Sequence, residues 1–156
     1  MVARWARWGL VLVLASSLAP AQPNARFAAP ANGTRTLSPG FIPDPMQVSG
    51  TARGAVDAST LAPTCSGFVG AAPDLALVLR GNEPWLRVYV SSPLDTTLVV
   101  RRPDGTFLCD DDTYGRHPSV EGAFPPGRYL VWVGTYHAGH TATYTLSVTE
   151  VRSNHP

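Results

Sequence analysis

In the C-terminal two thirds of the chain, apolar and polar residues alternate in short runs. The clearest run is 143–151, in which Tyr144, Leu146 and Val148 alternate with threonine and serine. A period of two places apolar side chains on one face of a strand and polar side chains on the other. Residues 129–134 are apolar on both faces, which is typical of a central strand that is covered twice. The pattern therefore predicts an antiparallel β domain.

Proline, glycine and aspartate separate these runs and mark the turns. Strands are expected at 48–56, 67–71, 75–79, 85–91, 96–102, 106–109, 119–124, 129–134 and 143–151. The turn at Pro103-Asp104-Gly105 predicts a hairpin, because proline fixes φ and glycine accepts a positive φ. Strands with one apolar face must pack sheet against sheet. We therefore expect an all-β fold, a single antiparallel β-sandwich of jelly-roll type.

The N-terminal residues 1–21 predict an export signal. Arg4 and Arg7 precede a short apolar run, and Ala19 and Ala21 supply the small residues of a cleavage site before Gln22. The alternative is a transmembrane anchor, but about 20 apolar residues are needed to span a bilayer and this run is shorter. We expect a secreted, periplasmic or cell-envelope protein with no membrane span in the mature chain.

Residues 22–46 contain five prolines and show no sustained period. They predict a linker, partly extended and partly disordered, ahead of a domain at 47–152. The chain carries 12 Lys and Arg residues against 11 Asp and Glu residues. Because it is nearly neutral and has no basic stripe, we exclude nucleic acid as a partner.

Two cysteines, Cys65 and Cys109, are present. In an exported chain they predict one disulfide. A disulfide that closes the loop between Cys65 and Cys109 stabilises a fold by about 4 kcal/mol in the chain-entropy description. Free thiols or a redox pair are the alternative, which the lack of a Cys-x-x-Cys spacing disfavours.

Several short motifs follow one another in a fixed order along the domain. They are LRVYV at 86–90, DTTLVV at 95–100, PDG at 103–105, DDD at 110–112, PGRY at 126–129 and YTL at 144–146. On these motifs, residues 48–151 resemble the bacterial pre-peptidase C-terminal domain family. The resemblance implies a secreted β-sandwich module of the kind appended to extracellular proteases and other exported enzymes. Some members of the family bind calcium through acidic loops, and most follow a catalytic domain.

An acidic turn is the first candidate site. The candidate calcium ligands are Asp95, Asp110, Asp111, Asp112 and Glu121. Counted from Asp110, the spacing approaches that of an EF-hand loop, with Gly115 at position 6 and Glu121 at position 12. Tyr114 at position 5 is a poor ligand and strands flank the turn, so a calcium loop in a β context is one interpretation. The other is a solvated turn in which aspartates accept hydrogen bonds from backbone amides.

Aromatic side chains form the second candidate site. The candidate ligand-binding surface consists of Trp85, Tyr89, Tyr114 and Trp132. Trp85 and Tyr89 share one face of a strand, and exposed planar rings bind sugars or peptides. The alternative is core filling, since tryptophan and tyrosine are highly buried on average.

The sequence offers no assembled catalytic group. Adjacent exposed carboxylates titrate alike, whereas paired catalytic acids need unequal environments. His137 and His140 lack the further ligands of a zinc site, and no Gly-x-Ser-x-Gly motif presents a serine nucleophile. We expect a non-catalytic binding or accessory module, with calcium as a candidate cofactor and an extracellular polysaccharide or protein surface as its partner. The alternatives are a ligand-free structural envelope protein and, less favoured, a hydrolase.

Overall fold

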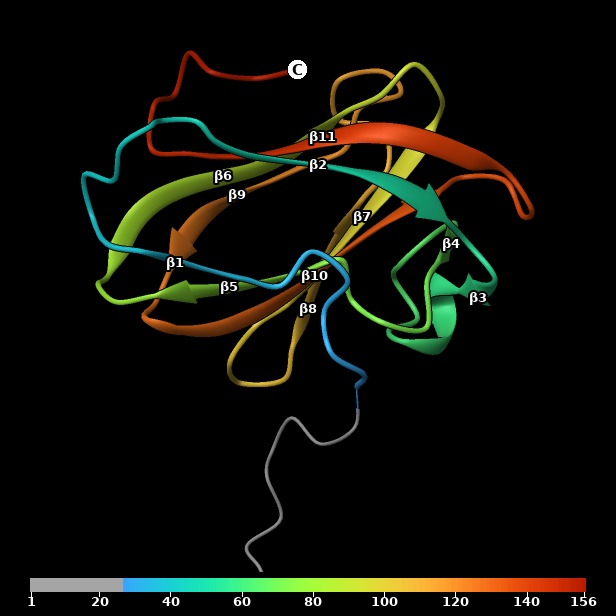
Figure 1. Cartoon of the computed structure of the whole chain (residues 1–156), viewed down its shortest axis with the longest axis horizontal. Coiled ribbons are helices and arrows are strands. Elements are labelled where there is room, and N and C mark those ends of the chain that lie inside the picture. Colours follow the sequence, from blue (N-terminus) through green and yellow to red (C-terminus); the bar gives the residue numbers. More distant parts are fainter. Residues whose placement is uncertain (1–26) are drawn as a thin grey trace, which may run out of the picture.

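The computed structural model describes residues 27–156, so the expected signal peptide lies outside the described residues. Two β-sheets pack face to face (Figure 1). The all-β sandwich expected from the sequence is confirmed. Within 27–156, no helix has the length and apolar character needed to cross a membrane.

The larger sheet, sheet A, has seven strands. They are β1 (Thr34–Leu37), β3 (Val56–Asp57), β4 (Phe68–Val69), β5 (Leu75–Leu79), β7 (Thr96–Arg101), β8 (Phe107–Asp110) and β10 (Gly127–Thr135). The central strand is β10, which pairs with β5 and β4 and also with β7. All pairs are antiparallel except β1 with β5, which is parallel.

The smaller sheet, sheet B, has four strands in the order β2-β11-β6-β9. They are β2 (Met46–Arg53), β6 (Glu83–Ser91), β9 (Ser119–Phe124) and β11 (Thr141–Thr149). The longest register joins β2 to β11, from Met46 opposite Val148 to Arg53 opposite Thr141. The strands of sheet B that come first and last along the chain, β2 and β11, therefore lie side by side.

The main core fills the space between the sheets. The alternating residues of β11 behave as the sequence predicts, since Tyr144, Leu146 and Val148 are buried in this core. Removal of apolar area from water is the dominant stabilising contribution of such a layer. The fully buried members of the main core include Leu75, Leu77, Leu86, Val88, Val90, Leu98, Val100, Tyr129, Val131, Leu146 and Val148.

A second apolar layer covers the outer face of sheet A. Leu130 and Trp132 of β10 and Val99 of β7 point into it. The cover is the segment after β3, which contains the short 3-10 helix η1 (Ala58–Thr60). Phe27 also contacts this layer, with its ring centroid 5.2 Å from that of Trp132. This second cover explains why β10 is apolar on both faces.

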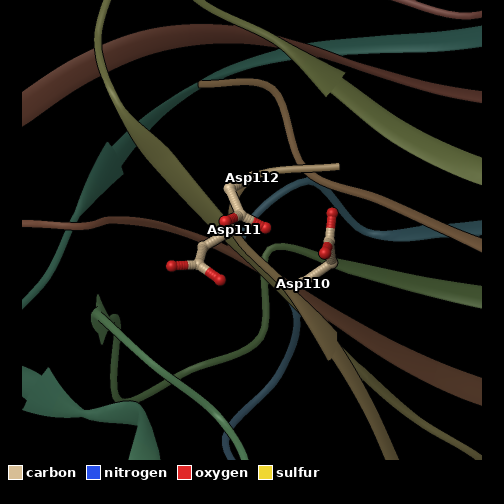
Figure 2. A group of neighbouring side chains, drawn as sticks. All are labelled: Asp110, Asp111 and Asp112. Atoms are coloured by element: carbon tan, nitrogen blue, oxygen red, sulfur yellow. The ribbon is translucent and has the colours of Figure 1, made fainter. Parts of the chain in front are cut away.

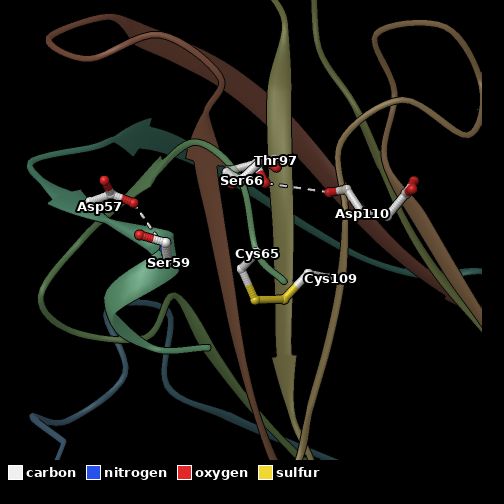
Figure 3. The surroundings of a disulfide bond; sticks show 7 residues. All are labelled: Asp57, Ser59, Cys65, Ser66, Thr97, Cys109 and Asp110. Atoms are coloured by element: carbon white, nitrogen blue, oxygen red, sulfur yellow. Dashed lines mark hydrogen bonds between the residues drawn. A yellow bond between two sulfur atoms is a disulfide. The ribbon is translucent and has the colours of Figure 1, made fainter. Parts of the chain in front are cut away.

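The predicted disulfide between Cys65 and Cys109 is confirmed, with the two Cα atoms 5.2 Å apart. It fastens the covering segment to β8 (Figure 3). A hydrogen bond also joins the covering segment to β7, because the Thr97 hydroxyl donates to the carbonyl of Ser66 at 2.8 Å. The outer layer is thus held by a covalent bond as well as by packing.

The described part of the expected linker belongs to the sandwich, which corrects the prediction for 22–46. Strand β1 pairs with β5, and Leu37 is only 8% exposed. Leu37 is the one buried residue of β1, so the strand has no alternating pattern that sequence reasoning could detect. Pro39, Pro43 and Pro45 lie in the segment that connects β1 to β2, and Pro30 precedes β1.

Candidate functional site

The acidic turn follows β8 directly. Carboxylate oxygens of Asp110, Asp111 and Asp112 lie within 4.8 Å of one another (Figure 2). Asp112 is exposed, and the other two are partly buried. The cluster brings together hard, anionic oxygen ligands of the kind that calcium prefers, although calcium takes 6–8 oxygens.

Asp110 has a structural role within this turn. Its Oδ2 accepts hydrogen bonds from the backbone amides of Ser119, at 2.7 Å, and Thr113, at 3.1 Å. These bonds fix both ends of the loop between β8 and β9. They are the backbone-capping contacts expected for a solvated turn, so part of the cluster is explained without a metal.

Charge repulsion within the cluster affects the pKa of Asp111. Burial raises the pKa of its carboxyl, and the negative charges of Asp112, Asp110 and Asp95 raise it further. Asp95, from the connection between β6 and β7, therefore adds its charge to the turn, but it is not among the three aspartates whose carboxylate oxygens lie within 4.8 Å of one another. A bound cation would relieve this repulsion.

Glu121 does not join the cluster, which corrects the predicted ligand set. Its carboxylate pairs with the guanidinium of Arg87, with Oε2 2.6 Å from Nη2. Glu121 lies directly opposite Arg87 in the β6–β9 register. The EF-hand spacing fails because Glu121 follows the pleat of a strand and is held across the sheet instead of closing a loop.

Two of the four predicted aromatic residues remain partly exposed, Trp85 and Tyr114. Tyr89 shares the outer face of sheet B with Trp85, yet it is only 6% exposed. Trp132 is fully buried in the second apolar layer. The core-filling alternative is therefore correct for Trp132, and neither it nor Tyr89 offers an open ring surface.

Trp85 and Tyr114 form a cluster with cationic residues, which we call the Trp85–Tyr114 cluster. Its members are Trp85, Arg87, Tyr114, Arg152 and His155. The guanidinium carbons of Arg87 and Arg152 lie 5.0 and 4.6 Å from the centroid of the Trp85 ring. Arg87 also lies 5.6 Å from the Tyr114 ring, on which His155 stacks with a centroid distance of 5.1 Å. Cation–π contacts at these distances are attractive.

Arg87 organises the cluster, and sequence reasoning missed it. The residue is only 6% exposed. Besides its bonds to Glu121, its Nη1 donates to the carbonyls of Arg152, at 3.0 Å, and Asn154, at 2.6 Å. Arg87 thereby ties the C-terminal tail at 151–156 to the outer face of sheet B. In the sequence, only the position of this charged residue between the apolar Leu86 and Val88 could have indicated its role.

A second acidic pair joins the start of β6 to the end of β11. Glu83 is 2% exposed and is in hydrogen-bonding contact with Glu150. Burial, the hydrogen bond to Glu150 and its charge raise the pKa of Glu83 to about 7. Both carboxylate oxygens of Glu150 accept from the amide of Gly40, at 3.0 and 2.9 Å. Burial beside Glu150 therefore favours the protonated form of Glu83, whose Oε1 is buried and has no hydrogen-bond partner among residues 27–156.

Comparison with known proteins finds similar folds at low identity. No family model matches the sequence, and no curated protein matches it either. One similar solved structure is the pre-peptidase C-terminal domain of a collagenase from Bacillus anthracis, at 15% identity and a TM-score of 0.48, covering 76% of this chain and 96% of that chain. Another is PliG of Aeromonas hydrophila, a periplasmic inhibitor of g-type lysozyme, at 16% identity and a TM-score of 0.41, covering 74% of this chain and 96% of that chain. At these values neither similarity assigns the chain to a family.

Proposed function

We propose that the protein is an exported, non-catalytic binding module. In this proposal the Trp85–Tyr114 cluster contacts an extracellular polysaccharide or protein surface, and calcium rigidifies the acidic turn. The disulfide supports export, because such bonds persist in oxidising compartments.

The observation that carries the proposal is that both candidate sites share one loop. Tyr114 follows the three aspartates closely in sequence, and the loop closes on itself through reciprocal backbone bonds between Tyr114 and His117, at 3.1 and 3.3 Å. Asp110 anchors the same loop to β9. A cation on the aspartates would therefore order the segment that positions the Tyr114 ring.

The chemistry of the cluster suits a polymer with polar or anionic groups. Planar rings give a large apolar contact area with a low entropy loss. Arg152 is exposed and adds a planar donor that matches carboxylate or phosphate groups. Glu121 offsets the charge of Arg87, so the exposed positive charge lies at the tail.

Retention of the full chain on insoluble polysaccharides and immobilised proteins tests the binding role. We expect Trp85→Ala and Tyr114→Ala to abolish retention. Tyr136→Ala is the matched control, because Tyr136 is an exposed ring, 41% accessible, outside the cluster. Equal retention of all variants, or none on any matrix for the unmodified chain, contradicts the binding proposal and favours a ligand-free structural protein.

Thermal unfolding with calcium and with chelator tests the metal role separately. A ligand at 100 times its dissociation constant stabilises the folded state by about 2.7 kcal/mol. We expect a clear rise in the melting temperature with calcium, and none in Asp112→Asn. An unchanged melting temperature in the unmodified chain removes calcium from the proposal and leaves the binding role to the retention assay.

A further inference from the structure

A pocket lies where two turns meet, and it shares no residue with the Trp85–Tyr114 cluster. We propose that it binds a small carboxylate with an apolar body. The pocket has a volume of about 370 Å³ between the β7–β8 hairpin turn and the β9–β10 turn. Ligand pockets typically start at about 300 Å³, so the space suits one ring or one amino-acid side chain. This inference is independent of the function proposed above.

The two turns are packed rigidly against each other. The hairpin closes through the Gly105 amide, which donates to the Arg102 carbonyl at 3.0 Å. On the other side, Gly127 has a φ of 146°, and a Cβ there would lie 2.5 Å from Pro103 Cγ. Only glycine permits this approach at this backbone conformation. The walls are thus formed before a ligand arrives, which lowers the entropy lost on binding.

The walls of the pocket are mainly apolar. Pro103, Ala123, Pro125 and Pro126 line it, and the buried Tyr129 lies behind them. The Tyr129 hydroxyl donates to the carbonyl of Pro125 at 2.6 Å, which satisfies its polar end and fixes the proline wall. An aromatic or aliphatic group fits such a lining better than a hydrated one.

Arg102 supplies the polar anchor. Its Nε is buried and finds no hydrogen-bond acceptor among residues 27–156. In the same range, no carboxylate lies within 4.0 Å of this guanidinium. Arg102 lines the pocket together with Asp104 and Tyr129, which places its positive charge there. The side chain as a whole is partly exposed and lines the pocket, and a carboxylate is the acceptor that matches the guanidinium fork.

Asp104 lies at the rim of the pocket, where its negative charge would repel an anionic ligand. Removing that charge therefore tests whether the ligand is an anion. Its Oδ1 accepts from the amide of Thr106, at 2.9 Å, and from the Thr106 hydroxyl, at 2.7 Å. Asparagine can keep both bonds through its own Oδ1 while removing the negative charge. Asp104→Asn should therefore strengthen carboxylate binding without changing the turn.

The test is calorimetric titration of the full chain with 3-phenylpropionate and with its neutral amide, 3-phenylpropionamide. We expect the carboxylate to bind at least about tenfold more tightly than the amide, as charge-assisted hydrogen bonds imply. Arg102→Gln should abolish this preference, and Asp104→Asn should raise carboxylate affinity by roughly two- to fivefold. Arg35→Gln, an exposed arginine on β1, is the control and should behave as the unmodified chain.

A second pair of probes distinguishes the source of the carboxylate. These are acetyl-Gly-Gly-Phe with a free C-terminal carboxylate and the same peptide with an amidated C-terminus. Tighter binding of the acidic peptide than of 3-phenylpropionate identifies peptide C-termini, and the reverse order identifies small metabolites. Amide NMR shifts should change at 102–105 and 123–129. Equal affinity for acid and amide, no binding of either acid, or shift changes confined to other residues would overturn the proposal.

Discussion

Replacing Glu83 by glutamine should reduce the pH dependence of stability of this domain between pH 4 and pH 8. Glu83 is buried beside Glu150, and its pKa in the folded protein is about 7 against an ordinary value of 4.5. Glutamine keeps the shape of the protonated acid and can donate its amide to Glu150. It cannot ionise, so the repulsion between the two side chains disappears at every pH.

The sign of the effect follows from proton binding. Between pH 4.5 and pH 7 the folded state holds a proton that the unfolded state has lost, so the free energy of unfolding falls as pH rises. At about 1.4 kcal/mol per pH unit, the whole difference corresponds to about 3 kcal/mol. Glu150 is partly exposed and solvent screens its charge, so we expect about 1–2 kcal/mol.

Urea denaturation at pH 4, 6 and 8, followed by tryptophan fluorescence, measures this effect. We expect Glu83→Gln to match the unmodified protein at pH 4 and to be more stable by about 1–2 kcal/mol at pH 8. Glu150→Gln is the matched control, because it removes the neighbouring charge and keeps an acceptor for the Gly40 amide. It should recover only part of the gain, since burial of Glu83 remains. Parallel stability curves for Glu83→Gln and the unmodified protein would refute the reasoning.

Three further variants test the contacts that hold the fold. Replacing Cys65 and Cys109 together by alanine should lower the free energy of unfolding by about 4 kcal/mol, measured by urea denaturation; a loss below about 1 kcal/mol would show that packing alone holds the outer layer. Arg87→Leu should cost about 2 kcal/mol and speed amide hydrogen exchange at 151–156, and unchanged exchange would contradict its role in holding the tail. Gly134→Ala should be strongly destabilising, because the new Cβ would overlap the backbone carbonyl of Phe68; a melting temperature equal to that of the unmodified protein would disprove this close approach.

The sequence predicts most strands because their side chains alternate or form short apolar runs. The expected strands at 75–79 and 119–124 match β5 and β9 at both ends. Strand β1 was missed because backbone pairing with β5 positions it, and three of its four residues are exposed. Strand β3 was not separated from β2, since it has only two residues.

The candidate sites were less predictable, for a related reason. Neighbours in sequence are neighbours in space within one turn, so the grouping of the three aspartates followed directly from the chain. The partner of Glu121 depends on the β6–β9 register, which the sequence does not specify. The burial of Trp132 depends on a covering segment that the sequence marks only through Cys65. The Glu83–Glu150 pair and the Arg102 pocket likewise join segments that are distant along the chain.

The adjacency of β2 and β11 has a consequence for how the chain acquires its structure. The edge of β2 that pairs within sheet B has no partner until residues 141–149 are available. Pairing of such distant segments slows folding, because a long loop must close first. A nascent chain therefore cannot complete sheet B, and truncation before residue 141 would leave an eight-residue strand with an open edge that is prone to intermolecular pairing.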